Sequence, residues 1–565
     1  MGILGALCIR KRRVLPQLMI FFAAAGLSRA AHAQSPEPPF DVYEVGVPEL
    51  QAAMAGGTVT SVQLVELYLA RIQAFDEAGP RLNAILQLNP LALQEAAALD
   101  EERARQGPRG PLHGIPVLLK DNFDVTGMPT TAGSIALLDM VPPDDSWLAG
   151  RLREGGAVLL GKTNMQEFAL GITTESSVGG QTRNPYDLTR NPGGSSGGTA
   201  VSVAASFAAL GWGTDTCGSV RIPAAYNSLF GLRPTKGLIS TDGMLPLSHS
   251  LDTPGPMART AMDLAIAMDA VLTPSPAEGS TGAPGGVAPH FVEGLDGGAF
   301  DGIRIGVLGD HLDGTWTVGE ILAELGRHLP SSGSLGREEL ESVTLGSAIE
   351  GLEVGQTARR ALERMEKWGA ELITVEIEEI EGLLAGHEVI DLEFELDVRA
   401  YLEGTPKARV HSLSEILALD LHNSSSNEML VQRSNPGSPD SGEYRDALAR
   451  LRAARDRLVE VFERERLDAL AYPTMRRPPA EIGQPQWGST CLLSSSTGLP
   501  AITIPVGLGP GGLPVGLELL GRPMDDARLV AFAHAYEKAM RPRMVPPTTP
   551  PLNRRSTAGQ GLERS

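Results

Sequence analysis

The sequence predicts an α/β fold built on a mostly parallel sheet. A chain of 565 residues with 42% apolar residues is long enough to bury a large hydrophobic core. The apolar run at 115–119 indicates a buried strand, a helix-like stretch follows it, and the apolar run at 157–160 repeats the strand pattern. Strand, helix and strand in this order are typical of helices layered on a parallel sheet.

Positions 1–33 have the features of a secretory signal peptide. Four basic residues at 10–13 precede the apolar stretch 15–27, and Ala31-His-Ala33 supplies small residues where signal peptidase cuts. The apolar stretch is shorter than the roughly 20 residues of a membrane-spanning helix. We therefore expect cleavage after Ala33, a periplasmic or secreted protein, and no membrane span after cleavage. Because residues 12 and 13 are both arginine, export by the twin-arginine route is also compatible with the sequence.

Charge and cysteine content narrow the class of protein. The net charge is −20, and it becomes −25 when the five basic residues of positions 1–33 are removed. Such acidity argues against nucleic acid or an anionic membrane surface as a partner. Cys8 lies in the signal segment, and Cys217 and Cys491 remain as one possible pair in an oxidising compartment. The spacing of Cys and His matches no zinc site, and we expect neither a metal nor an organic cofactor.

Two helices are predicted ahead of the first strand. Thr60 and Gln63 form a capping box before apolar residues at helical spacing, which predicts an amphipathic helix over 61–75. A second helix is predicted over 91–105. The strand at 115–119 then ends in Lys120, so we expect this strand to deliver a polar group at its end.

The second half of the chain is predicted to add further strands and helices. Residues 274–302 are rich in Gly, Pro and Ala and predict a long surface loop that joins two parts. Strands are predicted at 303–308, 371–377, 468–474 and 501–506, and helices at 343–368 and 441–466. The Pro-rich tail 541–565 is predicted to be disordered.

Two glycine-rich segments carry the candidate chemistry, 191–198 and 213–224. Glycine at this density lets the backbone approach a ligand closely. The first segment is not typical of a linker, because the apolar run 200–210 follows it, nor of a phosphate loop, because no Gly-Lys-Ser/Thr follows.

The same segment also matches Gly-x-Ser-x-Gly, the nucleophile elbow of α/β-hydrolases, with Ser196 as the nucleophile. That fold requires an acidic residue and a histidine farther along the chain. The downstream candidates are His387, His411, His422 and His534. Each stands in a helix-like or polar context that is typical of a surface or packing histidine. An α/β-hydrolase-like esterase is therefore kept as a weaker alternative.

A series of motifs occurs in one order along the chain. The segments are Leu112–Asp121, Gly161–Met165, Arg183–Tyr186, Asn191–Gly198, Gly213–Ala224 and Gly498–Val506. This order resembles the amidase signature family, closely over roughly 45–270. The resemblance implies an amidase-signature fold, with a mostly parallel mixed central sheet covered by helices on both faces. The branch of bacterial peptide amidases is most similar, on 180–186, 393–397 and 401–402.

The resemblance also implies a Ser-cisSer-Lys triad. Its lysine falls on Lys120, its bridging serine, preceded by a cis peptide, on Ser195, and its nucleophile on Ser219. The oxyanion hole falls on the backbone N–H groups of Thr216, Cys217, Gly218 and Ser219, and the supporting positions are Gln181, Ser196, Asp215 and Arg221. A serine hydroxyl requires a base, and lysine serves only if burial lowers its pKa. Structural alternatives are a lysine paired with Asp121 or Asp124, and a buried Asp215–Arg221 pair.

Cys217 departs from the family, which usually has glycine at this position. If the position requires a positive φ, cysteine strains the loop. We expect a packing side chain rather than a thiol nucleophile, because the motif offers no histidine as its base.

These observations predict a secreted serine amidase that hydrolyses the C–N bond of carboxylic amides through an acyl-enzyme. Residues 34–540 would form the amidase domain, in which 275–480 insert helices that shape the pocket. The expected substrates are neutral small-molecule or peptide amides, with C-terminal peptide amides as one candidate. An amidotransferase A-type subunit is the other alternative, and the signal peptide argues against it because aminoacyl-tRNA stays inside the cell. The sequence indicates no oligomeric state.

Overall fold

The computed structural model describes residues 40–272, 290–296, 300–313, 337–405, 408–435 and 437–552. For residues 337–347 it describes the backbone but not the side chains. The predicted signal peptide lies outside the described residues, and so does most of the predicted loop at 274–302. The compact unit that begins at Phe40 contains all the elements below.

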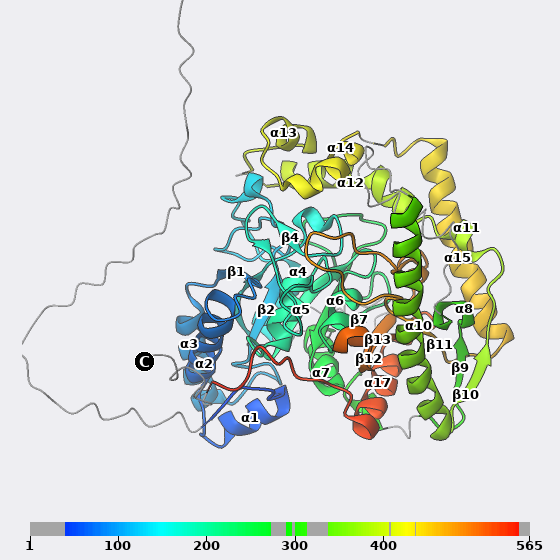
Figure 1. Cartoon of the computed structure of the whole chain (residues 1–565). Helices are drawn as coiled ribbons and strands as arrows, with labels where there is room; N and C mark the ends of the chain where they lie inside the picture. The colour runs from blue at the N-terminus through cyan, green and yellow to red at the C-terminus, as the bar shows by residue number, and fades with distance from the viewer. Residues whose placement is uncertain are drawn as a thin grey trace, which may run out of the picture. The chain divides into compact units, whose positions relative to one another are not determined.

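A large sheet forms the centre of the described fold (Figure 1). It has 11 strands among the described residues. In spatial order they are β1 (Ile85–Leu88), β3 (Val158–Thr163), β2 (Pro116–Lys120), β6 (Leu210–Asp215), β8 (Thr253–Ala258), β7 (Phe230–Arg233), β12 (Ala501–Leu508), β13 (Pro514–Leu520), β11 (Ala469–Pro473), β9 (Arg304–Val307) and β10 (Glu371–Thr374). The predicted α/β class is confirmed.

The sheet is mixed, with less parallel pairing than we expected. Parallel pairs occur in two groups, β3-β2-β6 and β11-β9-β10, and the other neighbouring pairs of described strands are antiparallel. The first two apolar runs, β2 and β3, are indeed parallel and fully buried. The connection between β12 and β13 is too short for a crossover, so these strands form an antiparallel hairpin.

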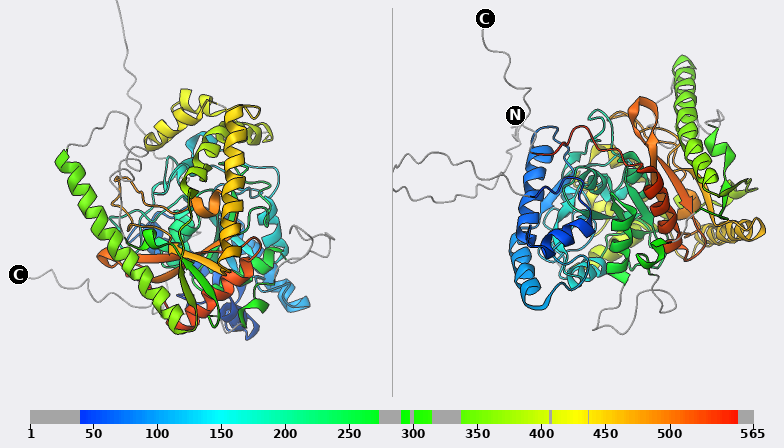
Figure 2. Two further views of the ribbon diagram at one scale, coloured as in Figure 1. Left: turned by 90° about the vertical axis from the view of Figure 1, so that its right-hand side faces the viewer. Right: turned by 90° about the horizontal axis from the view of Figure 1, so that it is seen from below.

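Helices flank the sheet (Figures 1 and 2). The main ones of the first half and of the end of the chain are α1 (Val47–Ala55), α2 (Ser61–Ile72), α3 (Ala92–Gln106), α4 (Trp147–Glu154), α5 (Gly197–Ala204), α6 (Arg221–Tyr226), α7 (Ala261–Leu272) and α17 (Asp526–Met540). The predicted capping box is present, because Thr60 and Gln63 each accept a hydrogen bond from the other's backbone N–H. The helix predicted over 61–75 ends at Ile72 and continues as a π-helical turn at 73–77.

The region from 337 to 464 is mainly helical. It contains α10 (Arg337–Lys367), α11 (Ile380–Leu383), α12 (Gly386–Glu403), α13 (Leu413–Ala418), α14 (Asn427–Arg433) and α15 (Gly442–Arg464). Helices α12, α13 and α14 lie together at the top of Figure 1 and share a hydrophobic cluster that includes Val389, Phe394 and Leu413. The same half of the chain supplies β9, β10 and β11, so it extends the central sheet as well as adding helices.

The C-terminal segment 541–552 packs on the rest of the unit, in contrast to the disorder that we expected for 541–565. Arg543 forms an ion pair with Glu44 at 2.6 Å. The guanidinium of Arg71 donates to the carbonyl groups of Thr549 and Pro550. Proline lacks an N–H donor but keeps its carbonyl acceptor, so side chains from the domain can hold such a segment. Residues 553–565 lie outside the described part.

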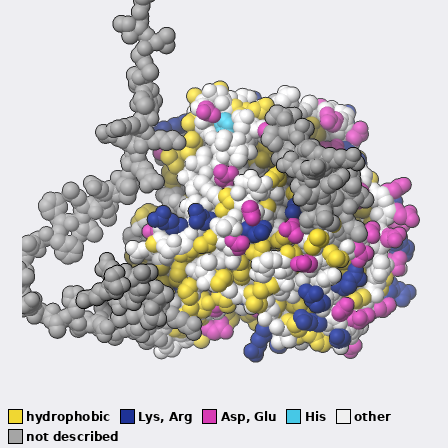
Figure 3. Space-filling model, in the orientation of Figure 1, with side chains coloured by type: hydrophobic (Ala, Val, Ile, Leu, Met, Phe, Trp, Pro, Cys, Tyr) yellow, Lys and Arg dark blue, Asp and Glu magenta, His cyan; other side chains and the backbone are white. Residues whose placement is uncertain are grey.

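Charged side chains of both signs are mixed on the face of the molecule shown in Figure 3. This mixture runs along the side that α15 forms. Within the described ranges, each helix is too short or too polar to cross a bilayer.

Candidate active site

Lys120 lies at the end of β2, between the parallel neighbours β3 and β6. Its side chain is fully buried, and its Nζ donates to the hydroxyl groups of Ser195 and Thr214, at 2.7 Å in each case. Lys120 therefore contacts the predicted bridging serine directly. Asp121 pairs instead with Lys162 at 3.2 Å, so the alternative pairing of Lys120 with Asp121 is wrong.

Burial lowers the pKa of Lys120 to about 7, because the charged ammonium loses its hydration. The negative charges of Asp252 and Asp215 oppose this shift and do not cancel it. A substantial fraction of the amine is consequently uncharged near neutral pH. An uncharged amine bonded to a hydroxyl can accept its proton.

Ser195 lies in a tightly packed glycine-rich turn that leads into α5. The peptide bond between Gly194 and Ser195 is cis, as the family resemblance implies. The Ser195 carbonyl accepts from the backbone N–H of Gln166 at 3.0 Å. A Cβ on Gly198 would lie against the carbonyl of Asn164 and 2.6 Å from that of Ala84. Only glycine allows α5 to approach the neighbouring chain this closely.

The loop after β6 carries Ser219 and is shaped by Asp215. The carboxylate of Asp215 accepts from the backbone N–H of Gly218 at 2.7 Å and of Val220 at 3.2 Å. Gly218 has a φ of 82°, which favours glycine, and Cys217 is not among the residues with positive φ. The predicted strain at Cys217 is therefore absent, because its glycine neighbour takes the left-handed conformation.

The backbone N–H groups of this loop fall into one that is bonded within the described part of the protein and three that are not. The N–H of Gly218 is occupied by Asp215. The N–H groups of Thr216, Cys217 and Ser219 donate to no acceptor among the described residues. Three of the four predicted oxyanion-hole donors thus remain available to a ligand oxygen.

Ser219 is 4% exposed, and its hydroxyl makes no hydrogen bond with a described residue. Its carbonyl accepts from the backbone N–H of Ser196 at 3.2 Å. This bond ties the Ser219 loop to the turn that holds Ser195, so the two predicted serines lie on adjacent, connected segments. A direct bond between their hydroxyl groups is not formed in this structure.

Asp215 and Arg221 form a fully buried ion pair at 3.1 Å, with Arg233 and Glu518 beside them. Burial alone would raise the pKa of Asp215, but the charges of Arg221 and Arg233 outweigh it and hold the pKa well below its usual range. Burial likewise disfavours charged Arg221, and Asp215 and Glu518 reverse that effect and raise its pKa. The pair is a charged support under the loop, as the structural alternative predicted.

Cys217 is joined to Cys491 by a disulfide bond, with their Cα atoms 5.1 Å apart. The expectation of a simple packing side chain at Cys217 is wrong, and the possible pair is formed. Cys491 precedes the short helix α16 (Leu492–Ser495), whose Ser495 hydroxyl donates to the sulfur of Cys217 at 3.7 Å.

Gln181 supports the site from a distance. Its side-chain amide donates to the carbonyl groups of Thr173, Thr174 and Thr182. Thr174 in turn bonds through its hydroxyl to the Gly193 carbonyl and to the Gly197 N–H, on both sides of Ser195.

The nucleophile-elbow alternative is wrong. Ser196 is fully buried, and its hydroxyl bonds with the backbone N–H and carbonyl of Thr214, at 3.3 Å each. None of the four candidate histidines, all of them described, forms a hydrogen bond with Ser196. His387 and His411 are exposed on the helical region, and His422 bonds with Asn427.

Several site residues were not predicted. Thr214 shares the Lys120 amine with Ser195, and Asp252 accepts from the Thr216 hydroxyl at 2.5 Å. Thr214 lies inside the glycine-rich motif 213–224, which was the available signal. Glu518 had no signal because its partner Arg221 lies 297 positions away. Arg233 is only 18 positions from Asp215 but lies outside the motif 213–224.

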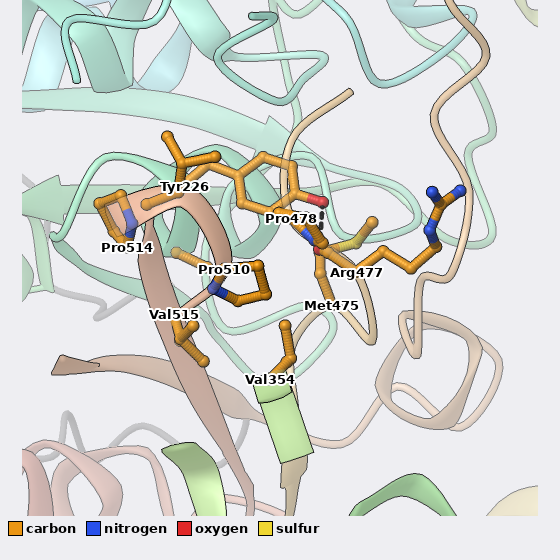
Figure 4. A pocket seen from close by; sticks show the side chains of 11 residues that line it. Tyr226, Val354, Met475, Arg477, Pro478, Pro510, Pro514 and Val515 are labelled. Atoms are coloured by element: carbon orange, nitrogen blue, oxygen red, sulfur yellow. Dashed lines mark hydrogen bonds between the residues drawn. The ribbon is translucent and has the colours of Figure 1, made fainter. Parts of the chain in front are cut away.

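A small hollow lies elsewhere, beside the end of α6 (Figure 4). Its lining is mainly apolar and includes Tyr226, Val354, Met475 and Pro510. The Tyr226 hydroxyl donates to the Arg477 carbonyl at 2.8 Å. The lining contains neither a predicted catalytic residue nor one of the free loop N–H groups, so we assign it no chemistry.

Known proteins resemble the chain over nearly its whole described length. The Amidase family model matches residues 63–331 and 347–530. The A subunit of glutamyl-tRNA(Gln) amidotransferase from Streptomyces coelicolor is 34% identical over 522 residues, covering 88% of this chain and 96% of that protein. The X-ray structure of native peptide amidase from Stenotrophomonas maltophilia is 35% identical with a TM-score of 0.77, covering 90% of this chain and 99% of that one. A peptide amidase structure in complex with the competitive inhibitor chymostatin is 34% identical, has a TM-score of 0.75 and covers 89% and 99%.

The family model covers most of the chain, and the relatives match it nearly end to end. The family and the relatives identify an enzyme that acts on carbon–nitrogen amide bonds. The chain belongs to the amidase family, the amidase signature enzymes.

Proposed function

We propose that the protein is an exported amide hydrolase in which Lys120, Ser195 and Ser219 form a Ser-Ser-Lys triad. The observation that carries the proposal is the 2.7 Å bond from the Lys120 amine, whose pKa is about 7, to the Ser195 hydroxyl. A lysine with its usual pKa would be almost fully protonated at pH 7 and could not serve as the base.

In this mechanism the Ser219 oxygen attacks the amide carbonyl carbon. Its proton passes to Ser195 while Ser195 gives its own proton to Lys120. The free N–H groups of Thr216, Cys217 and Ser219 stabilise the negative charge that develops on the carbonyl oxygen. The relay then runs backwards to protonate the leaving amine or ammonia. Water activated by the same relay hydrolyses the acyl-enzyme and frees the acid.

Covalent labelling with a fluorophosphonate probe tests the triad. We expect the label on Ser219, found by peptide mass spectrometry, and no label in Ser219→Ala. Lys120→Ala should lower amide turnover by about 10²-fold or more, the usual effect of losing a general base. Lys538→Ala, at an exposed lysine on α17, is the matched control and should keep normal turnover. A label on Ser196, or near-normal turnover in Lys120→Ala, contradicts the mechanism.

Neutral amides, including C-terminal peptide amides, are the proposed substrate class. Solved structures similar to this chain carry the name peptide amidase. Arg221, the one basic residue that the sequence offered for binding an anion, is fully buried in its ion pairs and is not free for a substrate carboxylate. A panel of neutral amides and malonamate, with mass spectrometry of the product acid, tests this choice. Faster turnover of malonamate than of any neutral amide contradicts it.

Export is the proposed localisation. The basic, apolar and small-residue segments of 1–33 support it, and so does a disulfide bond, since disulfides persist in oxidising compartments. N-terminal sequencing of protein from the periplasm or the medium should begin at Gln34 or close by. Soluble exported material that still begins at Met1 contradicts the cleavage.

The A-type component of an amidotransferase is the second candidate function, because curated relatives at about one-third identity carry that name. The two functions differ in their need for partners. A hydrolase acts alone on the amide panel, whereas a transferase component supplies ammonia to a partner that uses an aminoacyl-tRNA. Turnover of simple amides by the purified mature chain favours the first, and glutamine hydrolysis that appears only on adding partner proteins favours the second.

A further inference from the structure

The Cys217–Cys491 disulfide lies within the loop that carries the candidate nucleophile. Cys217 is two residues before Ser219, and its own N–H is one of the free donors. Cys491 lies 274 residues farther along the chain, before α16. The bond therefore joins the oxyanion loop to a segment near the C-terminal end of the described unit.

The loop is anchored on either side of Cys217 by hydrogen bonds. The Thr216 hydroxyl donates to Asp252 at 2.5 Å, and the Gly218 N–H donates to Asp215 at 2.7 Å. At Cys217 the disulfide supplies the anchor. The N–H groups that donate to no acceptor in the described part of the chain lie on Thr216, Cys217 and Ser219, so the covalent anchor is placed at the middle of the donor set.

The Cys491 end of the bond is itself held firmly. Its carbonyl accepts from the Arg221 guanidinium at 3.4 Å and from the Ser495 N–H at 3.1 Å. Arg221 is fully buried between Asp215 and Glu518. A Cβ on Gly218 would lie 2.9 Å from the Cys491 Cβ, so the two segments are in close contact. The cross-link thus fixes the loop to a rigid support.

We propose that Cys217 and Cys491 are positioning residues for the oxyanion-hole N–H groups, and that reduction of their disulfide lowers the catalytic rate. The inference rests on the proposed amidase function and deepens it, because it predicts that thiol reductants lower the activity of that site. The oxidised protein is the active form. In the reduced protein the loop keeps its hydrogen bonds but loses its covalent anchor at Cys217.

A dithiol is the class of reductant that fits this site. Cys217 is half-buried whereas Cys491 is buried, so a reductant thiolate attacks the Cys217 sulfur. The S–S bond breaks, and the Cys491 sulfur leaves as a thiolate and takes up a proton. The second thiol of the reductant then attacks the mixed disulfide and releases Cys217 as a thiol. The protein gains two electrons, and the dithiol becomes a cyclic disulfide.

The test compares the mature protein before and after dithiothreitol under native conditions. Alkylation with iodoacetamide and mass spectrometry verify that both cysteines have become thiols. The readouts are kcat and KM for a hydrolysed amide and the rate of fluorophosphonate labelling at Ser219. We expect kcat and the labelling rate to fall about tenfold or more, short of the roughly 10²–10³-fold that complete loss of an oxyanion donor costs, while KM changes little. Reoxidation with glutathione disulfide should restore both.

Cys217→Ser/Cys491→Ser is the companion variant, and it should be slow and indifferent to dithiothreitol. If that variant fails to fold, the reduction and reoxidation of the wild-type chain decides the question. Unchanged kcat and labelling in protein with both thiols verified overturn the proposal, as does a disulfide that native dithiothreitol does not open. Absence of labelling in both redox states is a different result, because it contradicts the proposed amidase itself.

Discussion

At the scale of single residues, the site depends on one amine that is kept partly uncharged. Lys120 contacts no carboxylate of the residues that the structure describes, and its bonds go to the hydroxyl groups of Ser195 and Thr214. A nearby salt-bridged lysine, Lys162, shows the contrast, because Asp121 lies 3.2 Å from its amine. Two fully buried lysines thus serve different purposes, and the difference lies in the charge of their neighbours.

The pH profile of kcat/KM should report the Lys120 amine. Only the unprotonated amine can act as the base, so activity should rise with pH, with an apparent pKa of about 7, and level off above it. Glu537 provides a control, because burial also raises its pKa to about 7 and it lies on α17. The Glu537→Gln variant should show the same fall in kcat/KM below pH 7 as the wild-type protein. A profile that stays flat down to pH 5.5 contradicts Lys120 as the base.

At the scale of elements, the strands were predicted from continuous apolar runs in the sequence. Local polar contacts contributed nothing to those predictions. The runs at 303–308, 468–474 and 501–506 correspond to β9, β11 and β12, because continuous apolar residues suit strands buried on both faces. Strand β8 (Thr253–Ala258) was missed because its two prolines and one glycine are unusual in a central strand.

The candidate site was predicted only as far as its motifs reach. Lys120 and Ser195 are in contact. This contact was expected because both residues lie in motifs that resemble those of the family. The contacts of Arg221 with Glu518 and of Cys217 with Cys491 join residues 297 and 274 positions apart. No local pattern in one sequence encodes such pairs, since they depend on the strand order of the completed sheet.

Helix α5 should tolerate no side chain at Gly198. Gly198→Ala would press a methyl group on the carbonyl groups of Asn164 and Ala84, so we expect the free energy of unfolding to fall by about 3 kcal/mol or more. Gly150→Ala on α4 is the matched control. A Cβ there meets nothing within 4 Å, and alanine should raise stability by about 0.5–1 kcal/mol. Urea unfolding measures both, and equal stability of the two variants contradicts the packing argument.

At the scale of the whole molecule, the two ends of the described unit are tied together. The chain after α17 runs back to α2, where Arg71 holds the carbonyl groups of Thr549 and Pro550 (Figure 1). Arg543 holds Glu44 ahead of α1 and also donates to the Ser228 and Ala204 carbonyl groups. The segment 541–552 therefore acts as a strap rather than as a free tail.

Arg543→Ala should weaken this strap by about 1–3 kcal/mol, because it leaves a half-buried carboxylate without its partner. Burial would raise the pKa of Glu44, but Arg543 outweighs this and lowers it below 4.5. The contribution is therefore present above pH 4.5 and is lost as the pH falls through the lowered pKa. Thermal unfolding at pH 7 and pH 3.5 measures it, with the exposed Arg541→Ala as the control. An equal effect of the two variants at pH 7 contradicts the strap.

The strand order also dictates when the molecule can be completed during synthesis. Strands β1 to β3 and β6 to β8 occupy one side of the sheet and β9 to β11 the other, and the hairpin of β12 and β13, at 501–520, is the part that joins them. A ribosome must therefore release almost the entire chain before the two sides can pair. Until then the inner edges at β7 and β11 have no neighbour and can bind other chains. A nascent chain of this topology therefore carries two unpaired strand edges until its last hairpin emerges.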